Sequence, residues 1–461
     1  MDRRQFLLTG GTAALFASLT PRTWADSPRP LLRRPRNLIF LVSDGMGIGT
    51  LALAEEWKLR TSGQSLHWLK LLSAKGVTRA LQNTASANSP VTDSAAAASA
   101  WGCGHRVNNG AINYTPDSRP QACLYTLAKE AGYRTGLVTT TRATHATPAG
   151  FAVNVKSRRK EREVALGYLA NEVDCVLGGG EEWFLEGPAG PEIFSKFAQA
   201  GYRVLRNRTE LLGLNGINGR RLLGIFCQDH LPYAVDRPRG GLTAQAIPSL
   251  TEMMAGALDC LRGGEKGFFL QVEAGRVDHA GHANDAAAIL RDQLEFDECI
   301  AQALAFQEEE PETLILITTD HGCGGAQLNG IGPGYLDSGP ALSRLTPMTR
   351  SFEGLYREIR EGGDLQTLLA RHLQIDLPAS EAEELHARVV QEQISSLAFC
   401  QRMGQLVAPR TAVGWTSQSH TAEHVEFTAC GPGAEAFSGY VQNAAIFHQL
   451  VEIFSLAKVE S

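Results

Sequence analysis

The chain has 461 residues, 43% of them hydrophobic, and carries a formal net charge of −6 at pH 7. This length is enough to bury a large core, in one large domain or in two. Because the sequence contains no basic stripe with interleaved aromatic residues, a dedicated nucleic-acid partner is not expected.

The chain begins with a segment that is typical of a processing signal. Arg3 and Arg4 precede a modestly apolar run with two glycines, and Thr-Trp-Ala at 23–25 offers a cleavage site. This pattern indicates a twin-arginine export signal over residues 1–25 and predicts a periplasmic or secreted protein. The apolar run is too short to span a membrane comfortably, so no stable membrane anchor is expected.

Five apolar runs predict buried strands, and three of them end in residues that can bind metal ions. Continuous apolar runs are typical of parallel strands that are covered on both faces. The runs are NLIFLVSD at 37–44, YRTGLVTTT at 133–141, DCVLGGG at 174–180, GFFLQVE at 267–273 and TLILITTDH at 313–321. The metal-binding types at their ends are Asp44, Glu273, Asp320 and His321.

Strands alternate with helical stretches along the chain. This order favours an α/β fold with three layers, α/β/α, around a mostly parallel central sheet. In such sheets, ligands gather at the carboxyl ends of the strands. We therefore expect the residues at the strand ends to contribute to one site.

The stretch VTDSAAAASAW at 91–101 predicts a helix that begins at Ser94. Alanine has the highest helix propensity, and small polar residues suit the N-terminal cap. A serine in this place faces free backbone N–H groups and the positive end of the helix dipole, which favours a bound phosphate. The alternative is that Asp93 or Ser94 serves only as a helix cap.

A second helix is predicted from Pro148, because proline suits the first turn of a helix. Arg158 lies eleven residues after Thr147, just over three turns, so a continuous helix would return it to nearly the same face. Arg159 would lie about 100° further round. This register predicts that Arg158, and not Arg159, reaches the site that Thr147 faces; the alternative is that both arginines, in the charged run RRKER, form a solvated helix end.

Three further segments differ in how clearly their sequence predicts secondary structure. Residues 181–240 are irregular by pattern, and a clear helix is predicted over 248–261. The tail at 438–459 resembles an amphipathic helix that closes the fold.

An accessory lobe is predicted within the last third of the chain. Residues 351–400 are charged and helical by pattern, with a capping box at Ser380 and Glu383. We expect residues 330–405 to form a lobe inserted before His420, the last candidate metal ligand.

The nine cysteines form no CxxC pattern, so a structural thiolate zinc site is not expected. Cys103 and Cys123 flank a loop rich in Asn, Gly, Ser and Pro, and they are candidates for an extracytoplasmic disulfide. Most of the others lie in apolar runs and are predicted to be buried small hydrophobic residues. No chemical role follows for Cys323, which is predicted to be structural.

The candidate metal ligands suit the hydrolysis of a phosphate monoester. Two metal ions about 4 Å apart can activate a nucleophile and stabilise the leaving oxygen. Zinc prefers His and carboxylate ligands, whereas magnesium prefers oxygen alone. The candidates divide accordingly into Asp278, His282 and His420; Asp44, Asp320 and His321, beside Ser94; and Asp44, Thr147 and Glu273.

Six motifs in order resemble those of the alkaline phosphatase family. They are SDGMG, VTDSAAAASAW, THATPA with SR eleven residues on, VEAGRVDHAGHANDAA, TTDHG and SQSHT. The resemblance covers roughly residues 36–325 and 410–450, and it is weak or absent over 330–405. It implies a catalytic domain over 36–455 that hydrolyses phosphate monoesters.

The resemblance also implies a role for individual residues. Ser94 would be the nucleophile that becomes phosphorylated, and Arg158 would bind the non-bridging oxygens of the substrate. His145 and His279 lie near the substrate at positions where members vary; with His at both, the chain is similar to members that need added magnesium more. The implied metals are a first zinc ion at Asp278, His282 and His420, a second zinc ion at Asp44, Asp320 and His321, and a magnesium ion at Asp44, Thr147 and Glu273.

Other functions and other roles stay open. A phosphodiesterase of the same superfamily is one alternative, and a catalytically silent, exported metal- or phosphate-binding protein is another. A sulfatase is excluded, because Ala95-Ala96-Ala97 follows Ser94 in place of the Pro and Arg context that formylglycine formation requires. The sequence also leaves open whether the chain forms a homodimer.

Three residues near the motifs have structural alternatives. Thr147 could merely cap the helix that follows it, and Asp93 is expected to cap the Ser94 helix or to position Arg158. His424 lies four residues beyond the last candidate ligand, and strand spacing points it away from the site.

Overall fold

The computed structural model describes residues 34–186, 192–214, 216, 219–237 and 246–456. The predicted export signal at 1–25 lies outside the described residues. Within the described ranges, no helix has both the length and the apolar character to cross a membrane.

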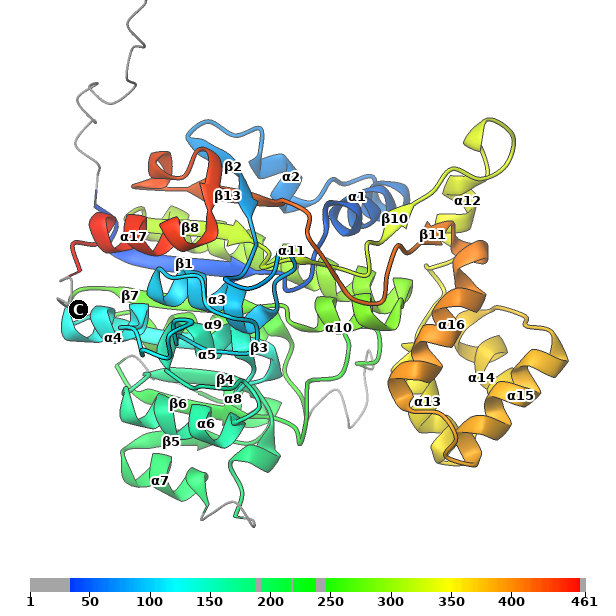
Figure 1. Ribbon diagram of the computed structural model, residues 1–461, viewed down its shortest axis with the longest axis horizontal. Coiled ribbons are helices and arrows are strands. Elements are labelled where there is room, and N and C mark those ends of the chain that lie inside the picture. Colours follow the sequence, from blue (N-terminus) through cyan, green and yellow to red (C-terminus); the bar gives the residue numbers. More distant parts are fainter. Residues whose placement is uncertain (1–33, 187–191, 215, 217–218, 238–245, 457–461) are drawn as a thin grey trace, which may run out of the picture. The chain divides into compact units, whose positions relative to one another are not determined.

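A ten-stranded sheet lies at the centre of the fold (Figure 1). Its strand order is β14-β2-β13-β8-β1-β7-β3-β4-β6-β5. β13 is antiparallel to both neighbours, and the other pairs in this sheet are parallel, which confirms the expected mostly parallel sheet. The strands are β1 Asn37–Val42, β2 Val77–Asn83, β3 Arg134–Arg142, β4 Cys175–Gly179, β5 Tyr202–Leu205, β6 Arg221–Ile225, β7 Phe268–Glu273, β8 Thr313–Thr318, β13 Val425–Cys430 and β14 Gly439–Gln442.

Two short ribbons lie outside this sheet. One pairs β10 with β11, and the other pairs β9 with β12. Their strands are β9 Gly322–Cys323, β10 Gln327–Leu328, β11 Val413–Gly414 and β12 His420–Thr421.

The helices alternate with the strands through most of the chain. They are α1 Ile48–Ser62, α2 His67–Leu71, α3 Ser94–Cys103, α4 Leu124–Glu130, α5 Ala146–Ala152, α6 Glu161–Ala170, α7 Ile193–Gln199, α8 Arg208–Leu212, α9 Leu250–Leu261, α10 Arg276–Ala283, α11 Ala286–Glu309, α12 Ser338–Ser343, α13 Phe352–Arg360, α14 Leu365–Leu368, α15 Ala379–Val390, α16 Ser396–Thr411 and α17 Asn443–Ile453.

Helices cover both faces of the sheet. On one face, Trp101 of α3 and Phe151 of α5 pack against Phe40 of β1, each with a ring centroid 5.2 Å from that of Phe40. Ile39 and Leu41 point to the other face, because strand side chains alternate, and they are buried in one core with residues of α9 and α11. The predicted three layers are therefore confirmed.

The helices α3 and α5 approach each other unusually closely. A Cβ atom on Gly102 would lie 1.8 Å from the carbonyl oxygen of Gly150, so a side chain at this position would force the helices apart. The side chain of Asn113 donates to the same carbonyl oxygen over 2.7 Å. This contact fixes the helix that begins at Ser94 beside the helix that contains Thr147.

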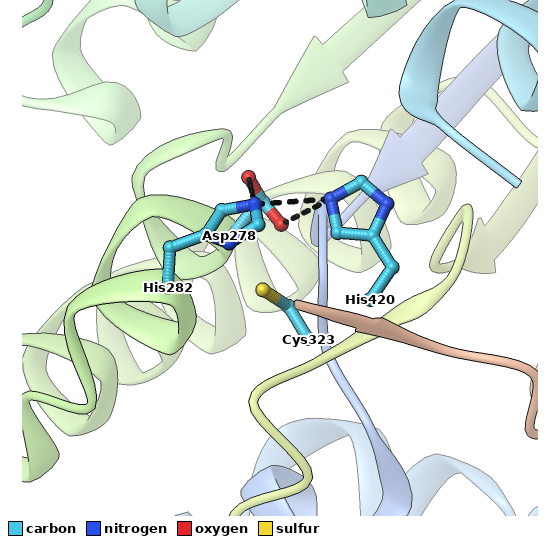
Figure 2. A group of neighbouring side chains, drawn as sticks. All are labelled: Asp278, His282, Cys323 and His420. Atoms are coloured by element: carbon cyan, nitrogen blue, oxygen red, sulfur yellow. Dashed lines mark hydrogen bonds and ion pairs between the residues drawn. The ribbon is translucent and has the colours of Figure 1, made fainter. Parts of the chain in front are cut away.

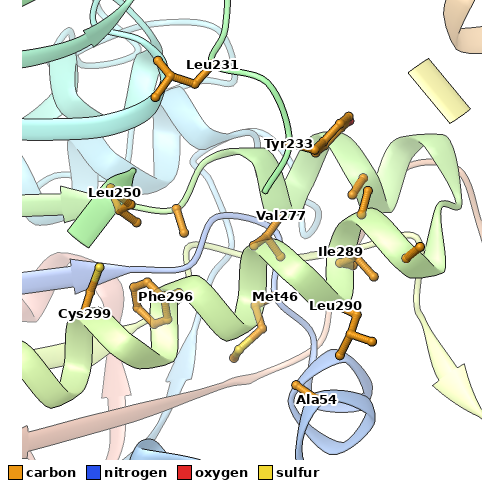
Figure 3. Packing of buried hydrophobic residues seen from close by; sticks show 14 of the residues in the cluster. Met46, Ala54, Leu231, Tyr233, Leu250, Val277, Ile289, Leu290, Phe296 and Cys299 are labelled. Atoms are coloured by element: carbon orange, nitrogen blue, oxygen red, sulfur yellow. The ribbon is translucent and has the colours of Figure 1, made fainter. Parts of the chain in front are cut away.

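The core extends to the carboxyl ends of the strands. Met46, two residues after Asp44, and Val277, directly before Asp278, are buried in one apolar cluster with Ile289 of α11 (Figure 3). Full burial of such side chains contributes about 1.5–3 kcal/mol each. The core therefore fixes the backbone next to two candidate metal ligands.

The segment 330–405 supplies helices α12 to α15 and the start of α16, and α13 to α16 form a group beside α10 (Figure 1). Glu353 of α13 accepts a 2.6 Å hydrogen bond from Arg276 of α10. The backbone N–H of Phe352 donates to Asp285, which lies between α10 and α11, over 2.7 Å. These contacts connect the inserted helices to α10, which carries two candidate ligands.

Several local predictions are wrong. The segment 181–240, predicted to be irregular, contains α7, β5, α8 and β6 within its described residues. The helix α15 begins at Ala379 after Pro378, and its N-terminus has no side-chain cap, so the capping box at Ser380 is absent there. Because the helix begins one residue before Ser380, this serine lies inside the first turn and not at the N-cap.

The candidate disulfide between Cys103 and Cys123 is not formed in the structure. All nine cysteines lie in the described part of the chain, and none of them is paired. Eight are buried, and Cys227 is partly exposed, which fits the prediction that most act as small hydrophobic residues.

Candidate active site

The carboxyl ends of three neighbouring strands carry the first candidate ligands. β8, β1 and β7 are adjacent and parallel, so these ends lie at the same edge of the sheet. Asp44 follows β1, Glu273 ends β7, and Asp320 and His321 follow β8. The structure buries all four side chains completely.

Asp44, Asp320 and His321 form a compact group beside Ser94. The Nε2 atom of His321 lies 3.1 Å from Asp320 Oδ2 and 3.7 Å from Asp44 Oδ1. Ser94 Oγ lies 3.3 Å from the same nitrogen. One hydroxyl therefore faces the point on which an imidazole and two carboxylates converge.

The buried carboxylates of this group favour the binding of a cation. Burial, and after it the charges of neighbouring carboxylates, chiefly Asp320, raise the pKa of Asp44 well above its ordinary value. Asp44 Oδ1 and Asp320 Oδ2 are buried and have no hydrogen-bond partner among the described residues. Two buried carboxylate charges beside one imidazole are costly, and a bound metal ion would compensate them.

A second group contains Asp278, His282, Cys323 and His420 (Figure 2). One potential ligand atom from each of these residues lies within 4.8 Å of the others. The two imidazole Nε2 atoms are 3.0 Å apart, and they lie 3.5 and 3.4 Å from the two carboxylate oxygens of Asp278. The group joins α10 to the ribbon formed by β9 and β12.

Backbone carbonyl groups orient both histidines of this second group. His282 Nδ1 lies 2.8 Å from the carbonyl oxygen of Gln418, and His420 Nδ1 lies 2.8 Å from that of Thr92. A carbonyl oxygen only accepts, so each Nδ1 carries a proton. In the neutral imidazoles, each Nε2 lone pair is then free to bind a metal ion.

The histidine and carboxylate charges of the second group are also coupled. Burial lowers the pKa of His420, but the hydrogen bond and the charge of Asp278 outweigh burial and raise it to about 9. In the metal-free protein the carboxylate is therefore compensated by a proton on the histidine. A metal ion would take over this compensation.

A third group lies on the other side of Asp44. Its members are Asp44, His145 and Glu273, again with ligand atoms within 4.8 Å of one another. Thr147 Oγ1 lies 3.2 Å from Asp44 Oδ2 and donates to it. The N-cap of α5 is His145 and not Thr147, so the alternative that Thr147 merely caps this helix is wrong.

Threonine hydroxyl groups hold one oxygen of Glu273 and leave the other free. Thr139 Oγ1 makes a short hydrogen bond to Glu273 Oε2, and Thr141 Oγ1 lies 3.3 Å from it. Glu273 Oε1 is buried without a hydrogen-bond partner among the described residues, 3.6 Å from His145 Nδ1. This oxygen points to where the third group could bind a cation.

Three histidine rings stand next to this third group. His145 and His279 have ring centroids 5.8 Å apart, and His230 lies 4.3 Å from His279. Burial, followed by the charge of Arg276, lowers the pKa of His279 well below its ordinary value, so this ring is neutral. Sequence reasoning missed His230, which lies outside every motif in a segment without a clear pattern.

Asp93 has both of the roles considered for it. Its side chain accepts from the backbone N–H of Ala96 and so caps α3 at the residue before Ser94. Its other oxygen accepts a 3.0 Å hydrogen bond from Arg158, whose second terminal nitrogen lies 3.0 Å from His145 Nε2. The guanidinium group is therefore oriented from two sides beside the nucleophile candidate.

The helix register predicted for Arg158 is wrong. α5 ends at Ala152, and a bridge between Val155 and Ile112 follows before α6 begins. Arg158 lies in the turn after this bridge, where its backbone N–H donates to Gly110 over 2.8 Å. It reaches the site from this turn and not from the face of a helix.

An open cavity of about 600 Å³ lies beside this arginine. Asp93, Arg158, Arg159, Lys156 and Tyr114 are among the residues that line it. Its cationic side chains suit an anionic ligand. Arg159 is exposed, whereas Arg158 is partly buried.

The donor sets fit metal ions of two kinds. The group of Asp278, His282, Cys323 and His420 offers nitrogen, oxygen and sulfur, and the group around His321 offers nitrogen and oxygen, both of which suit zinc. Asp44, Thr147 and Glu273 offer oxygen, which suits magnesium. Sequence reasoning missed the proximity of Cys323 to the first of these groups.

His424 lies apart from all three groups. Its Nε2 atom is 2.9 Å from the hydroxyl of Tyr440 on β14. The interpretation of this histidine as incidental to the site agrees with its position.

The chain matches known proteins over nearly its whole length. The family model described as alkaline phosphatase matches residues 35–456. Alkaline phosphatase 4 of Bacillus subtilis is 28% identical and covers 97% of this chain and 95% of its own length. The alkaline phosphatase of Schizosaccharomyces pombe is 32% identical and covers 91% of this chain and 81% of its own length.

A solved structure agrees with these matches. The crystal structure of Thermus thermophilus alkaline phosphatase superposes with a TM-score of 0.86 at 34% sequence identity, and it covers 92% of each chain. The family match at 35–456 spans the segment from α12 to α16 as well as the central sheet.

Proposed function

The chain belongs to the alkaline phosphatase family and hydrolyses phosphate monoesters with the help of metal ions, and we propose that Ser94 is the nucleophile of this reaction. The single observation that supports the proposal most is the position of Ser94 Oγ. It lies at the N-terminus of α3, 3.3 Å from His321 Nε2, on which the buried carboxylates of Asp44 and Asp320 also converge.

In this proposal, one side chain attacks the phosphorus atom and others bind the phosphate oxygens. Ser94 Oγ forms a bond to phosphorus, the bond to the leaving group breaks, and water later releases phosphate from the phosphoserine. The N-terminus of α3 and the guanidinium group of Arg158 bind the non-bridging oxygens. Asp93 holds Arg158 in place for this contact.

We assign two zinc ions and one magnesium ion to the three groups. The first zinc ion is assigned to Asp278, His282 and His420, the second to Asp44, Asp320 and His321, and the magnesium ion to Asp44, Thr147 and Glu273. When bound, these ions supply the positive charge that activates a hydroxyl or water and stabilises the leaving oxygen. His145 and His279 are assigned to the edge of the magnesium and substrate sites.

The substrate class has a direct test. Activity toward p-nitrophenyl phosphate should exceed activity toward bis-p-nitrophenyl phosphate, because a monoester carries the charge that Arg158 and the metal ions bind. A preference for the bis-ester would favour the phosphodiesterase alternative. No activity toward either compound with zinc and magnesium present would favour a binding protein.

We further propose that the protein is exported through the twin-arginine pathway to the periplasm or beyond. The support is the sequence of residues 1–25, with its paired arginines and its cleavage site. Replacement of both Arg3 and Arg4 by Lys should leave the protein, with its signal uncleaved, in the cytoplasm.

Replacement of Arg158 by Ala is expected to lower kcat/KM for monoesters on the order of 10- to 150-fold. A charge-assisted hydrogen bond contributes about 1.5–3 kcal/mol, and this contact strengthens toward the transition state. Inhibition by inorganic phosphate should weaken in parallel, and both effects are measured by steady-state kinetics. Arg159→Ala is the matched control and should change these values less than about threefold, because an exposed charge contributes little. The opposite pattern would contradict the role of Arg158.

Replacement of His282 or His420 by Ala is expected to lower the zinc content of the purified protein. Each imidazole offers its Nε2 lone pair to the same group, and no other described histidine within the group can replace it. Metal analysis after dialysis should show a loss of about one zinc ion for each variant. His424→Ala, the matched control, should retain its zinc. Equal zinc contents in all three variants would contradict the assignment.

A further inference from the structure

Cys323 lies where sequence reasoning gave it no role. It is the second residue of β9, two positions after His321, and it pairs directly with His420 of β12. Residues directly opposite in an antiparallel pair have Cβ atoms about 4.5–5.5 Å apart on the same side of the ribbon. The pairing therefore sets the sulfur of Cys323 beside the imidazole of His420.

The sulfur completes a four-residue group. Figure 2 shows the side chain of Cys323 directed toward Asp278 and His282, and ligand atoms of these three residues and His420 lie within 4.8 Å of one another. Cys323 is only 1% exposed. Asp278 Oδ1, which is buried in the same group, lies 3.4 Å from His420 Nε2. A buried sulfur and a buried carboxylate oxygen thus share one centre with two imidazole nitrogens.

The surrounding backbone fixes the position of this sulfur. Gly281, between the two ligand candidates of α10, leaves room for it, since a Cβ atom there would lie 3.1 Å from Sγ and 2.9 Å from the Cβ of Cys323. The N–H of Cys323 donates to Gly45 over 2.8 Å, and the N–H of Gly324 donates to Ser419 over 3.0 Å. The backbone is therefore held on both sides of the cysteine.

We propose that the Cys323 thiolate is a fourth protein ligand of the metal ion bound by Asp278, His282 and His420. The inference rests on the proposed function, because it requires a metal ion in this group. Binding exchanges the thiol proton for the metal ion, and the proton leaves to solvent. One sulfur, two nitrogens and one carboxylate oxygen form a tetrahedral set that favours zinc, cobalt or cadmium over magnesium.

Four protein ligands hold this metal ion more firmly than three. A zinc site with four protein ligands is closed, so a substrate oxygen must enter as an additional ligand. The first metal ion should therefore exchange more slowly than the ion at Asp44, Asp320 and His321. The sulfur also separates this group chemically from the other two, which contain no sulfur among their described members.

Zinc K-edge X-ray absorption of the wild-type zinc protein tests the ligand directly. The proposal predicts a sulfur neighbour of zinc at about 2.3 Å in addition to nitrogen and oxygen neighbours at about 2.0–2.2 Å. Zinc bound with only nitrogen and oxygen neighbours would overturn the role of Cys323 and leave the three-residue site intact. Failure to bind zinc would overturn both this inference and the proposed function.

Cobalt(II) substitution supplies the matched comparison between variants. The wild-type protein and Cys430→Ser, a control at another buried cysteine, should show a thiolate-to-cobalt charge-transfer band. Cys323→Ser should lose this band, keep the ligand-field bands of bound cobalt, and bind the metal at least about 10-fold more weakly. A charge-transfer band that persists in Cys323→Ser would overturn the inference. The wild-type absorption spectrum decides the question even if the variant does not fold.

Discussion

Removal of the bound metal is expected to reduce phosphatase activity to the background rate. The site buries Asp44, Asp320 and His321 completely and gives several of their ligand atoms no hydrogen-bond partner among the described residues. Metal ions at such groups supply several kcal/mol of transition-state stabilisation, which corresponds to a loss on the order of 10³-fold or more on their removal. The measurement is hydrolysis of p-nitrophenyl phosphate after treatment with a chelator.

The identity of the metal ions that restore activity makes this test more specific. Zinc with magnesium should restore the activity, and magnesium alone should not, because the groups at His321 and His282 contain nitrogen ligands. Metal analysis must verify that the treated sample is free of metal. Full activity in such a sample would contradict the proposed site.

Replacement of Ser94 by Ala is expected to remove most of kcat, but not all of it. The hydroxyl at the start of α3 is the proposed nucleophile, and its loss leaves attack by water as the remaining route. Steady-state kinetics measures the loss, and metal content should stay at the wild-type value, because Ser94 belongs to none of the three ligand sets. Wild-type kcat in this variant would contradict direct attack by Ser94.

The buried strands and their ends could be predicted because the signal is local. A parallel strand that is covered on both faces requires a continuous apolar run, and the chain changes from apolar to polar where the strand meets the site. The runs at 37–44, 267–273 and 313–321 therefore located β1, β7 and β8, and the sheet brings their last residues together. The helix start at Ser94 was predicted for a similar reason, since cap and alanine run are adjacent in sequence.

β13 and the strands at the sheet's margin were missed, the latter because their patterns are mixed. β2 alternates buried and exposed residues only over part of its length, and β14 buries one residue of four. β5 and β6 are short; β6 pairs with β4, and β5 pairs with β6 at the edge of the sheet. These strands form through tertiary contacts, which a short stretch of sequence does not reveal.

The site residues outside the motifs depend on the same kind of contact. Arg158 reaches Asp93 from a turn and not from a helix, so the correct neighbourhood was predicted with the wrong local structure. Cys323 joins the group of His420 through a ribbon whose two strands are almost one hundred residues apart in the chain. His230 reaches His279 from the loop that follows β6.

Mass spectrometry of a reaction quenched at acidic pH tests the central claim most directly. The protein is mixed with p-nitrophenyl phosphate, quenched with acid, digested and searched for phosphorylated peptides. The account predicts phosphate on Ser94, because this hydroxyl alone faces His321 and the buried carboxylates at the N-terminus of α3 among the described serines. Phosphate on another residue, or inversion of configuration at phosphorus, would contradict it.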